Sequence, residues 1–121
     1  MIEVEYLDLE DVLEMVRILD VGPVRDVGLL DSAIARPRSS AFGEDSYPSL
    51  GLKAAALLHS ITNYHALVDG NSRLAWLSTV VFCDVNGLAS QLSDDDAFQL
   101  VWDIAGSQID VALIAERLRL A

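Results

Sequence analysis

The sequence contains one cysteine, Cys83, and one lysine, Lys53, among 121 residues. A single cysteine excludes an internal disulfide and a thiolate metal cluster, which suits a reducing compartment such as the cytoplasm. Cys83 lies in an apolar stretch and is expected to be a small buried hydrophobe. Eight basic residues oppose 19 acidic ones, and the formal charge of −11 argues against a surface that neutralises nucleic-acid phosphates. Direct binding to nucleic acid is therefore not expected.

A long hydrophobic run and a secretory signal are also missing. The strongest apolar stretch, residues 74–85, has about half of the roughly 20 residues that a membrane-spanning helix needs. The first six residues contain two glutamates and no basic residue, unlike the basic start of a signal peptide. Internal repeats are absent, and 121 residues suffice for one hydrophobic core. We expect one domain over residues 1–121, no membrane partner and a buried helix at 74–85.

Apolar residues at helical spacing occur along most of the chain. Leu9, Val12, Leu13, Val16 and Leu19, for example, recur at intervals of three and four and would line one face of an amphipathic helix. The pattern predicts an all-α fold, a compact single-domain bundle of about six helices. The expected helices span residues 8–20, 26–35, 50–64, 71–85, 93–105 and 110 to the C-terminus.

Local signals support several of these boundaries. Ser49 can cap the third helix, and Ser93 begins the fifth with the spacing of a capping box. Gly87 follows the fourth helix, where glycine commonly ends helices. The large aromatic side chains of the later helices are expected to be packing residues instead of a base-stacking platform: Trp76, Phe98 and Trp102.

Residues 36–48 interrupt the helical pattern with two prolines, one glycine and three serines. This composition predicts a loop or a short hairpin. At roughly a dozen residues the segment is longer than a simple connection needs, and such loops often carry function.

The segment 65–73, between the two most apolar helices, has more polar chemistry than a turn requires. A helix N-terminus presents unpaired backbone N–H groups and a partial positive charge, so it is a natural anion site. Gly70 would let the backbone approach a phosphate, Asn71 could cap the helix, and Ser72 adds an N–H and a hydroxyl. Arg73 in the first turn opposes the helix dipole but would suit a phosphate.

Two further residues complete a possible phosphate-transfer site. Asp69 offers the oxygen ligand that Mg²⁺ prefers, and His65 could accept a proton from an incoming hydroxyl. Each residue alone has an ordinary explanation: His65 as a helix-terminal histidine, Asp69-Gly70 as a turn, Arg73 as a surface residue. The coincidence of all of them within nine positions favours a site for phosphoryl or nucleotidyl transfer.

This segment resembles the signature of the Fic/Doc superfamily, His-x-Phe-x-(Asp/Glu)-(Gly/Ala)-Asn-(Gly/Lys)-Arg. Its surroundings are similar to the death-on-curing (Doc) branch over nearly the whole chain: residues 28–33, the Arg36-Pro37 break, the loop from Phe42 to Pro48, residues 53–56 and the stop at 86–87. The resemblance implies a compact helical Fic/Doc-type fold whose motif loop binds ATP and Mg²⁺. Fic enzymes transfer AMP to a protein hydroxyl, whereas Doc toxins phosphorylate a threonine of elongation factor Tu. A Doc toxin is paired with an antitoxin whose flexible C-terminal segment lies in a groove of the toxin.

The resemblance also implies residue roles. His65 would be the catalytic base and Asp69 the Mg²⁺ ligand. Residues 36–48 would form a flap that aligns the target through Ala41, Phe42 and Gly43. The nucleotide phosphates would be bound by Gly70, Asn71, Ser72 and Arg73.

Three positions depart from the family pattern. Leu67 replaces the usual phenylalanine, a smaller apolar anchor. Ser72 stands where Doc proteins have lysine and Fic proteins have glycine, which removes a positive charge. Trp76 occupies the place of a second arginine of the AMP-transferring pattern, a residue that Doc proteins also lack.

The leading hypothesis is a Doc-like toxin of a toxin–antitoxin module, an ATP- and Mg²⁺-dependent protein kinase that acts on a translation factor. Two alternatives remain open. One is AMP transfer to a protein hydroxyl. The other is a catalytically degenerate domain that only binds an antitoxin-like peptide, for which Ser72 is the best argument.

Overall fold

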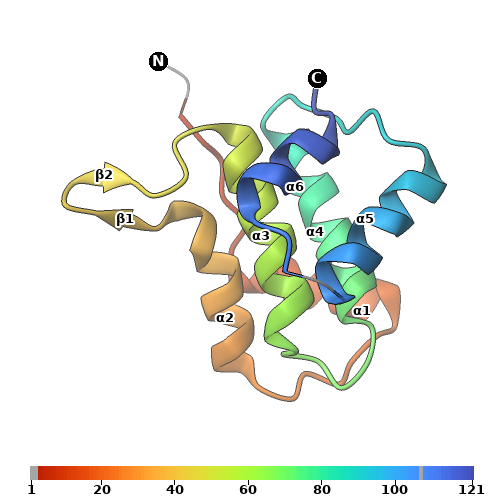
Figure 1. The fold of residues 1–121 in the computed structure, drawn as a ribbon. Coiled ribbons are helices and arrows are strands. Elements are labelled where there is room, and N and C mark those ends of the chain that lie inside the picture. The colour runs from red at the N-terminus through yellow and green to blue at the C-terminus, as the bar shows by residue number, and fades with distance from the viewer. Residues whose placement is uncertain (1–2, 107) are drawn as a thin grey trace.

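The computed structural model describes residues 3–106 and 108–121. Over these residues the chain forms a helical bundle with one small hairpin (Figure 1), which confirms the predicted all-α fold. The elements are α1 (Leu9–Leu19), α2 (Val27–Ala35), the 3-10 turn η1 (Arg36–Arg38), β1 (Ser40–Ala41), β2 (Glu44–Asp45), α3 (Leu50–Tyr64), α4 (Asn71–Val85), α5 (Asp94–Gly106) and α6 (Val111–Leu118).

Side-chain caps set most helix starts. Asp8, Asp26, Ser49 and Asp110 each accept a hydrogen bond from a backbone N–H in the first turn of the helix that follows. Ser93 does the same for α5, where its hydroxyl accepts the N–H of Asp96 at 3.1 Å. The caps predicted at Ser49 and Ser93 are therefore confirmed.

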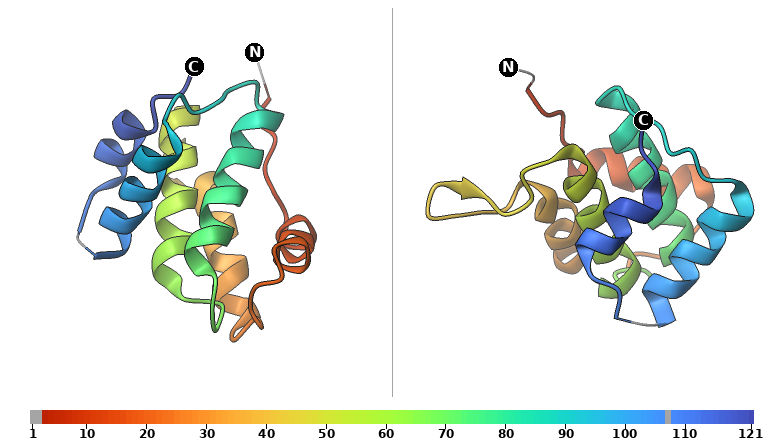
Figure 2. Two further views of the ribbon diagram at one scale, coloured as in Figure 1. Left: turned by 90° about the vertical axis from the view of Figure 1, so that its right-hand side faces the viewer. Right: turned by 45° about the horizontal axis from the view of Figure 1, so that its top comes forward.

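Helix α3 is the centre of the bundle. It packs against α2, α4, α5 and α6, while α1 packs against α4 (Figure 2). In the left panel of Figure 2, α1 is seen nearly end-on while the other helices run along the view, so α1 crosses the bundle. A central helix of this kind must be apolar on most of its faces, which explains why its sequence is rich in alanine and leucine.

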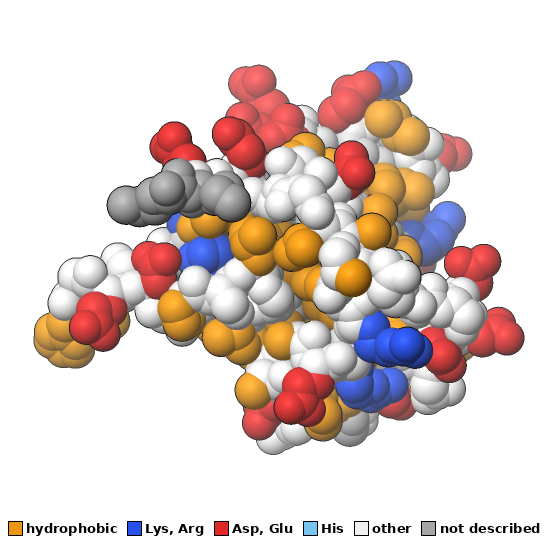
Figure 3. Space-filling model, turned by 90° about the horizontal axis from the view of Figure 1, so that it is seen from above, with side chains coloured by type: hydrophobic (Ala, Val, Ile, Leu, Met, Phe, Trp, Pro, Cys, Tyr) orange, Lys and Arg blue, Asp and Glu red, His pale blue; other side chains and the backbone are white. Residues whose placement is uncertain are grey.

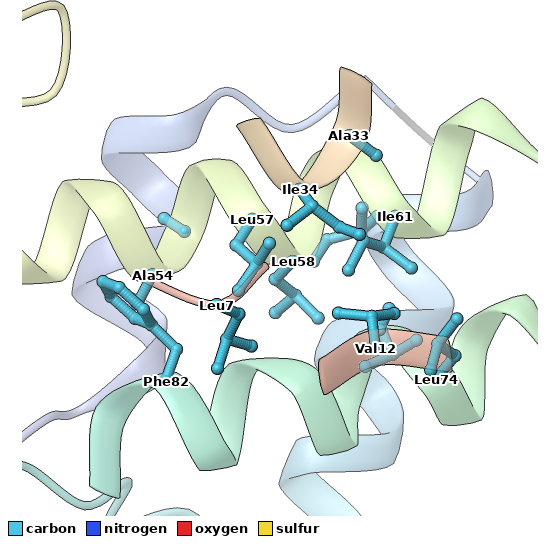
Figure 4. Close-up of a cluster of buried hydrophobic side chains, with 14 of the residues drawn as sticks. Leu7, Val12, Ala33, Ile34, Ala54, Leu57, Leu58, Ile61, Leu74 and Phe82 are labelled. Atoms are coloured by element: carbon cyan, nitrogen blue, oxygen red, sulfur yellow. The ribbon is translucent and has the colours of Figure 1, made fainter. Parts of the chain in front are cut away.

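The core lies between α3 and α4. Leu57, Leu58 and Ile61 of α3 face Leu74 and Phe82 of α4 (Figure 4), and each of these side chains is at most 2% exposed. The cluster is completed from the N-terminal part of the chain by Leu7, Val12, Ala33 and Ile34. The two helices that flank the motif segment are thus held rigidly against each other.

Cys83 belongs to this core. It is 3% exposed, and burial raises the pKa of its thiol to about 11. The thiol therefore stays protonated near neutral pH and packs as a small apolar group, as the sequence predicted.

Residues 36–48 form η1 and an antiparallel hairpin, one of the two predicted structures. Ser40 pairs with Asp45 and Ala41 with Glu44. The hairpin projects from the bundle as an arm near the beginning of α3 (Figure 1).

The end of the chain differs from the prediction. The last helix was expected to continue to the C-terminus, but α6 ends at Leu118 and Arg119 adopts a left-handed conformation. The final residues instead pair with the segment before α5, where Ala89 and Ala121 exchange two backbone hydrogen bonds of 3.0 Å. Backbone pairing across the molecule therefore replaces the last helical turn. Within residues 3–106 and 108–121, every helix falls short of the length and apolarity needed to cross a membrane.

Candidate active site

The segment that carries the predicted site joins the end of α3 to the start of α4. His65 is the C-cap of α3 with φ of 54°, and Gly70 is the N-cap of α4 with φ of 89°. Leu67 is buried at 2% exposure, which confirms it as the apolar anchor of this motif loop, residues 65–70. The side chains of His65 and Asp69 are exposed, so both are open to a ligand from solvent.

The N-terminus of α4 is left open. No side chain caps it, in contrast to α1, α2, α3 and α6. The first N–H groups of a helix have no intrahelical acceptor, so those of Asn71, Ser72 and Arg73 are available to an anion. Ser72 and Arg73 are themselves exposed at this end of α4.

Asn71 does not cap α4, contrary to the sequence-based interpretation. Its side chain turns back onto the loop, where Oδ1 accepts the N–H of Leu67 and Nδ2 donates to the carbonyl of Leu67, both at 3.0 Å. One amide side chain thus satisfies both backbone groups of the apolar anchor. Asn71 positions the motif loop through its side chain, and its backbone N–H stays available to an anion at the start of α4.

A second segment, residues 21–26, braces the motif loop from outside. Val24 and Leu67 form an antiparallel bridge, and the N–H of Gly22 donates to the carbonyl of Asp69 at 2.9 Å. The N–H of Val68 donates in turn to the carbonyl of Pro23 at 3.0 Å. The carbonyl of the proposed metal ligand and the backbone on its N-terminal side are therefore fixed by a partner strand.

Arg25 was missed by the sequence interpretation. Its guanidinium donates through both Nε and Nη2 to the carbonyl of His65, and its backbone N–H donates to the carbonyl of Ala66 at 2.7 Å. A left-handed conformation at a non-glycine residue such as His65 costs free energy, and these bonds stabilise it. The sequence carries no signal for this role because Arg25 lies 40 positions before His65.

Position 70 requires glycine for two reasons: the positive φ of its backbone and the lack of room for a Cβ atom. A Cβ atom built at Gly70 would lie 2.5 Å from both Cβ and Cγ1 of Val21. The motif loop and the 21–26 segment are therefore packed so closely that any side chain at this position would push them apart.

The predicted flap is not beside the motif loop. Ala41, Phe42 and Gly43 lie at the hairpin arm near the start of α3, whereas His65 lies at its end (Figure 1). The 15 residues of α3 span roughly 22 Å at 1.5 Å per residue. The segment that contacts the motif loop is 21–26 instead. The sequence identified the irregular segment correctly, and its position before α3, with the motif loop after α3, puts the two segments at opposite ends of that helix.

The residues present fit a magnesium–nucleotide complex held largely by phosphate. Within the part of the chain that the structure describes, no three His, Cys, Asp or Glu side chains cluster as a metal site. Asp69 therefore offers a single carboxylate next to the open N-terminus of α4. One carboxylate combined with substrate phosphates and water is the usual protein environment of Mg²⁺ in such sites.

An apolar groove of about 690 Å³ begins at this end of α4 and runs between α1, α4 and α5. Ser72 and Arg73 form part of its lining, together with Trp76. Phe98 and Trp102 also line it, stacked with ring centroids 6.2 Å apart, and they are 68% and 65% exposed. These two aromatics were expected to be packing residues, and they stack on each other along the groove with most of their surface exposed, whereas Trp76 packs against the core.

The effect of the close approach at Gly70 can be separated from that of its backbone angle. Gly43 has a similar φ of 79°, but a Cβ there would meet nothing within 4 Å. Gly43→Ala should lower the free energy of unfolding by about 1 kcal/mol through conformational strain alone. Gly70→Ala should lower it by about 3 kcal/mol because overpacking against Val21 is added. Urea denaturation of both variants measures the difference, and equal losses would contradict the role given to Val21.

Comparison with known proteins agrees with this geometry. A model of the Fic/DOC family matches residues 6–83, which include α1, α2, α3, the motif loop and most of α4. The chain is also similar to a protein of Mycolicibacterium smegmatis named Toxin Doc, with 48% identity over 118 residues that cover 94% of this chain and 91% of the relative. The matched range includes the motif segment, residues 65–73. The chain belongs to the Fic/DOC family.

Proposed function

We propose that the chain is the toxin of a toxin–antitoxin module and that it transfers the γ-phosphate of ATP to a hydroxyl of a translation factor such as elongation factor Tu. The observation that carries the proposal is the uncapped N-terminus of α4, which directly follows a motif loop with exposed His65 and Asp69. The similarity to Toxin Doc of M. smegmatis supports the toxin role. Such an enzyme would act in the cytoplasm, where translation takes place.

Phosphate binding would rely on the backbone. The N–H groups of Asn71, Ser72 and Arg73 and the dipole of α4 attract an anion, and the guanidinium of Arg73 adds the charge. Asp69 would hold Mg²⁺, which when bound supplies neutralisation of the phosphate charge. Arg25 brings a second cation to the motif loop, although its guanidinium is directed at the carbonyl of His65.

His65 would act as the general base. In the proposed step the imidazole accepts the proton of the target hydroxyl, the hydroxyl oxygen forms a bond to the γ-phosphorus, and the bond between that phosphorus and ADP breaks. The position of the imidazole depends on the backbone of His65, which the C-cap conformation and Arg25 fix. A base held in this way is placed before the target arrives, which favours transfer to an oriented hydroxyl.

Phosphate transfer is preferred here over AMP transfer because Trp76, in the place of the second arginine, lines the groove next to Arg73. AMP transfer stays the second candidate because Ser72 also leaves the site without the lysine that is usual in Doc proteins.

The apolar groove is the proposed site for the antitoxin. Its volume of about 690 Å³ and its stacked aromatics, Phe98 and Trp102, suit an apolar segment of a partner. Because Ser72 and Arg73 line the same groove, an occupant would lie against the phosphate-binding end of α4. A flexible antitoxin segment that orders on binding could in this way restrain the enzyme.

Incubation of this protein with elongation factor Tu, ATP and Mg²⁺ tests the reaction. We expect one added phosphate on the factor by mass spectrometry, and loss of at least about 100-fold in rate for His65→Ala, the range of a general base. A gain of AMP would favour the second candidate. If neither label appears, the kinase assignment with this target is wrong.

The contribution of the missing lysine can be measured directly. Ser72→Lys adds a cation at an exposed position of the first turn of α4, where no cap is disturbed. We expect the KM for ATP to fall by roughly tenfold, the effect of one charge-assisted hydrogen bond of about 1.5 kcal/mol, with little change in the KM for the protein target. Unchanged ATP kinetics would show that this position does not face the phosphates.

The antitoxin site is tested by co-expression with the cognate antitoxin. Trp102→Ser and Phe98→Ser each remove an exposed ring from the groove and should leave the fold intact. We expect both variants to arrest growth despite the antitoxin, with binding weakened by about tenfold or more. Val85→Ser, at an exposed position of α4 outside the groove lining, is the control that should be neutralised normally. Normal neutralisation of the two groove variants would place the antitoxin elsewhere.

A further inference from the structure

A second cavity, of about 720 Å³, lies where α3 meets the end of α5 and the segment that leads into α6. Its volume is in the range of small-molecule sites. Among the described residues it shares Ala105 with the apolar groove and no residue with the motif loop. The proposed reaction therefore makes no use of this cavity.

The polar part of the lining includes two side chains of α3, His59 and Asn63. Residues four positions apart lie on the same face of a helix, so the two side chains are neighbours. Apolar side chains from α5 and from the segment before α6 also line the cavity: Ile104, Ala105 and Ile109. The cavity thus combines two neighbouring polar groups with apolar surface, the usual make-up of a small-molecule site.

The position of the proton on His59 is fixed by Arg36. A guanidinium can only donate, so the 2.7 Å contact between Nη1 of Arg36 and Nδ1 of His59 makes Nδ1 the acceptor. Burial and the charge of Arg36 lower the pKa of His59, which keeps the imidazole neutral near pH 7. The ring proton is then on Nε2, which has no hydrogen-bond partner among the described residues. His59 therefore offers an N–H donor to the cavity.

Arg36 is itself held in place, by Tyr47. Its Nε donates to the Tyr47 hydroxyl at 2.9 Å, and its guanidinium carbon lies 5.5 Å from the centre of the Tyr47 ring. Neither Tyr47 nor His59 carries a negative charge. Lys53 differs: it is 1% exposed and donates to Oδ2 of Asp45 at 3.2 Å as well as to the carbonyl of Pro37 at 3.3 Å. Within the described part of the chain, the charge of Arg36 is thus not neutralised by a carboxylate.

Asn63 supplies the matching acceptor. Its Nδ2 donates to the backbone carbonyl of His59 at 3.1 Å, which fixes the orientation of the amide. Its Oδ1 accepts no hydrogen bond from any residue that the structure describes. The cavity therefore has one donor and one acceptor side by side, both held in place by their other bonds.

The charges around the cavity favour a neutral ligand. Asp110 belongs to the lining, and although its Oδ1 accepts the N–H of Leu113 at 2.8 Å, the carboxylate stays negative. Acidic side chains are also spread around the face shown in Figure 3, and the formal charge of the chain is −11, so an anion would be repelled. A cation would in turn be disfavoured by the charge of Arg36 beside His59.

We propose that this cavity binds a neutral nucleoside through the lactam edge of its base, where a ring N–H and a carbonyl lie side by side. Nε2 of His59 donates to the carbonyl, and Oδ1 of Asn63 accepts the ring N–H. The flat faces of the base bury apolar surface against Ile104 and Ile109. Binding here is independent of phosphate transfer at the motif loop.

Inosine and uridine are the probes, because they carry a lactam edge on a purine and on a pyrimidine. We expect at least one of them to bind with a Kd below about 1 mM in isothermal titration calorimetry. The matched ligands 1-methylinosine and 3-methyluridine have a methyl group in place of the ring N–H. They should bind about tenfold or more weakly, because Oδ1 of Asn63 loses its donor.

Three variants locate the binding. Asn63→Leu removes the acceptor with a good helix former in the last turn of α3 and should weaken binding by about tenfold or more. Gln91→Leu removes an exposed amide outside the cavity lining and is the control that should bind normally. His65→Ala should also bind both nucleosides as the wild type does, because the motif loop does not line the cavity.

Binding of inosine alone would assign the cavity to purines, and binding of uridine alone would assign it to pyrimidines. Absence of binding by both at about 5 mM would overturn the proposal. So would equal binding of the methylated nucleosides or unchanged binding by Asn63→Leu. Loss of binding in His65→Ala would place the nucleoside at the motif loop instead and would leave the proposed phosphate transfer untouched.

Discussion

The backbone pairing between residues 21–26 and the motif loop is the constraint on which the site depends. The loop must reverse the chain between two tightly packed helices while its polar side chains stay outside. Buried backbone groups need hydrogen-bond partners, and here the partners come from another segment and from one amide side chain, Asn71. Gly70 allows the two segments to approach within van der Waals contact. The geometry of the site is therefore a property of the whole N-terminal part of the chain and not of the motif alone.

The acidic charge of the chain sets the proposed phosphate site apart from most phosphate sites. The chain as a whole is strongly acidic, and the long-range field would repel a nucleotide. Under the proposed function, attraction would come from short-range sources: the open end of α4, the guanidinium of Arg73 and a divalent cation at Asp69. Oriented backbone groups cost no side-chain entropy on binding. An acidic domain can therefore still bind an anionic cofactor, provided that the cofactor arrives with its metal.

Much of the fold could be predicted from the sequence because helical periodicity and cap residues are local signals. Helices α3 and α4 have the predicted bounds, and Ser49 and Ser93 cap where expected. Contacts between segments that are far apart in the sequence were harder to predict. The last turn was predicted as helix because the sequence does not show that Ala121 pairs with Ala89. Phe98 and Trp102 were expected to be packing residues because they are large and hydrophobic, although both line a groove that leaves them exposed.

The same contrast applies to the candidate site. The motif residues were identified because they are contiguous, and contiguity needs no tertiary information. Arg25 was missed, since only the fold brings it to His65. The segment expected to form the flap does form a hairpin, which lies near the beginning of α3 while the motif loop lies at its end. The side chain of Asn71 was expected to cap α4, because spacing alone does not show that it instead bonds to the backbone of Leu67, four residues before it.

Because Lys53 is buried, its amine is inaccessible to enzymes and reagents that modify lysine. It is the only lysine of the sequence and is 1% exposed, with its amine committed to Asp45 and Pro37. The folded surface therefore presents no side-chain amine. Acetylation of lysine, conjugation of protein tags to lysine and crosslinking through lysine all require such a group, so the folded molecule is a poor substrate for each of them. Unfolding would expose Lys53, and lysine-directed chemistry would then report selectively on the unfolded chain.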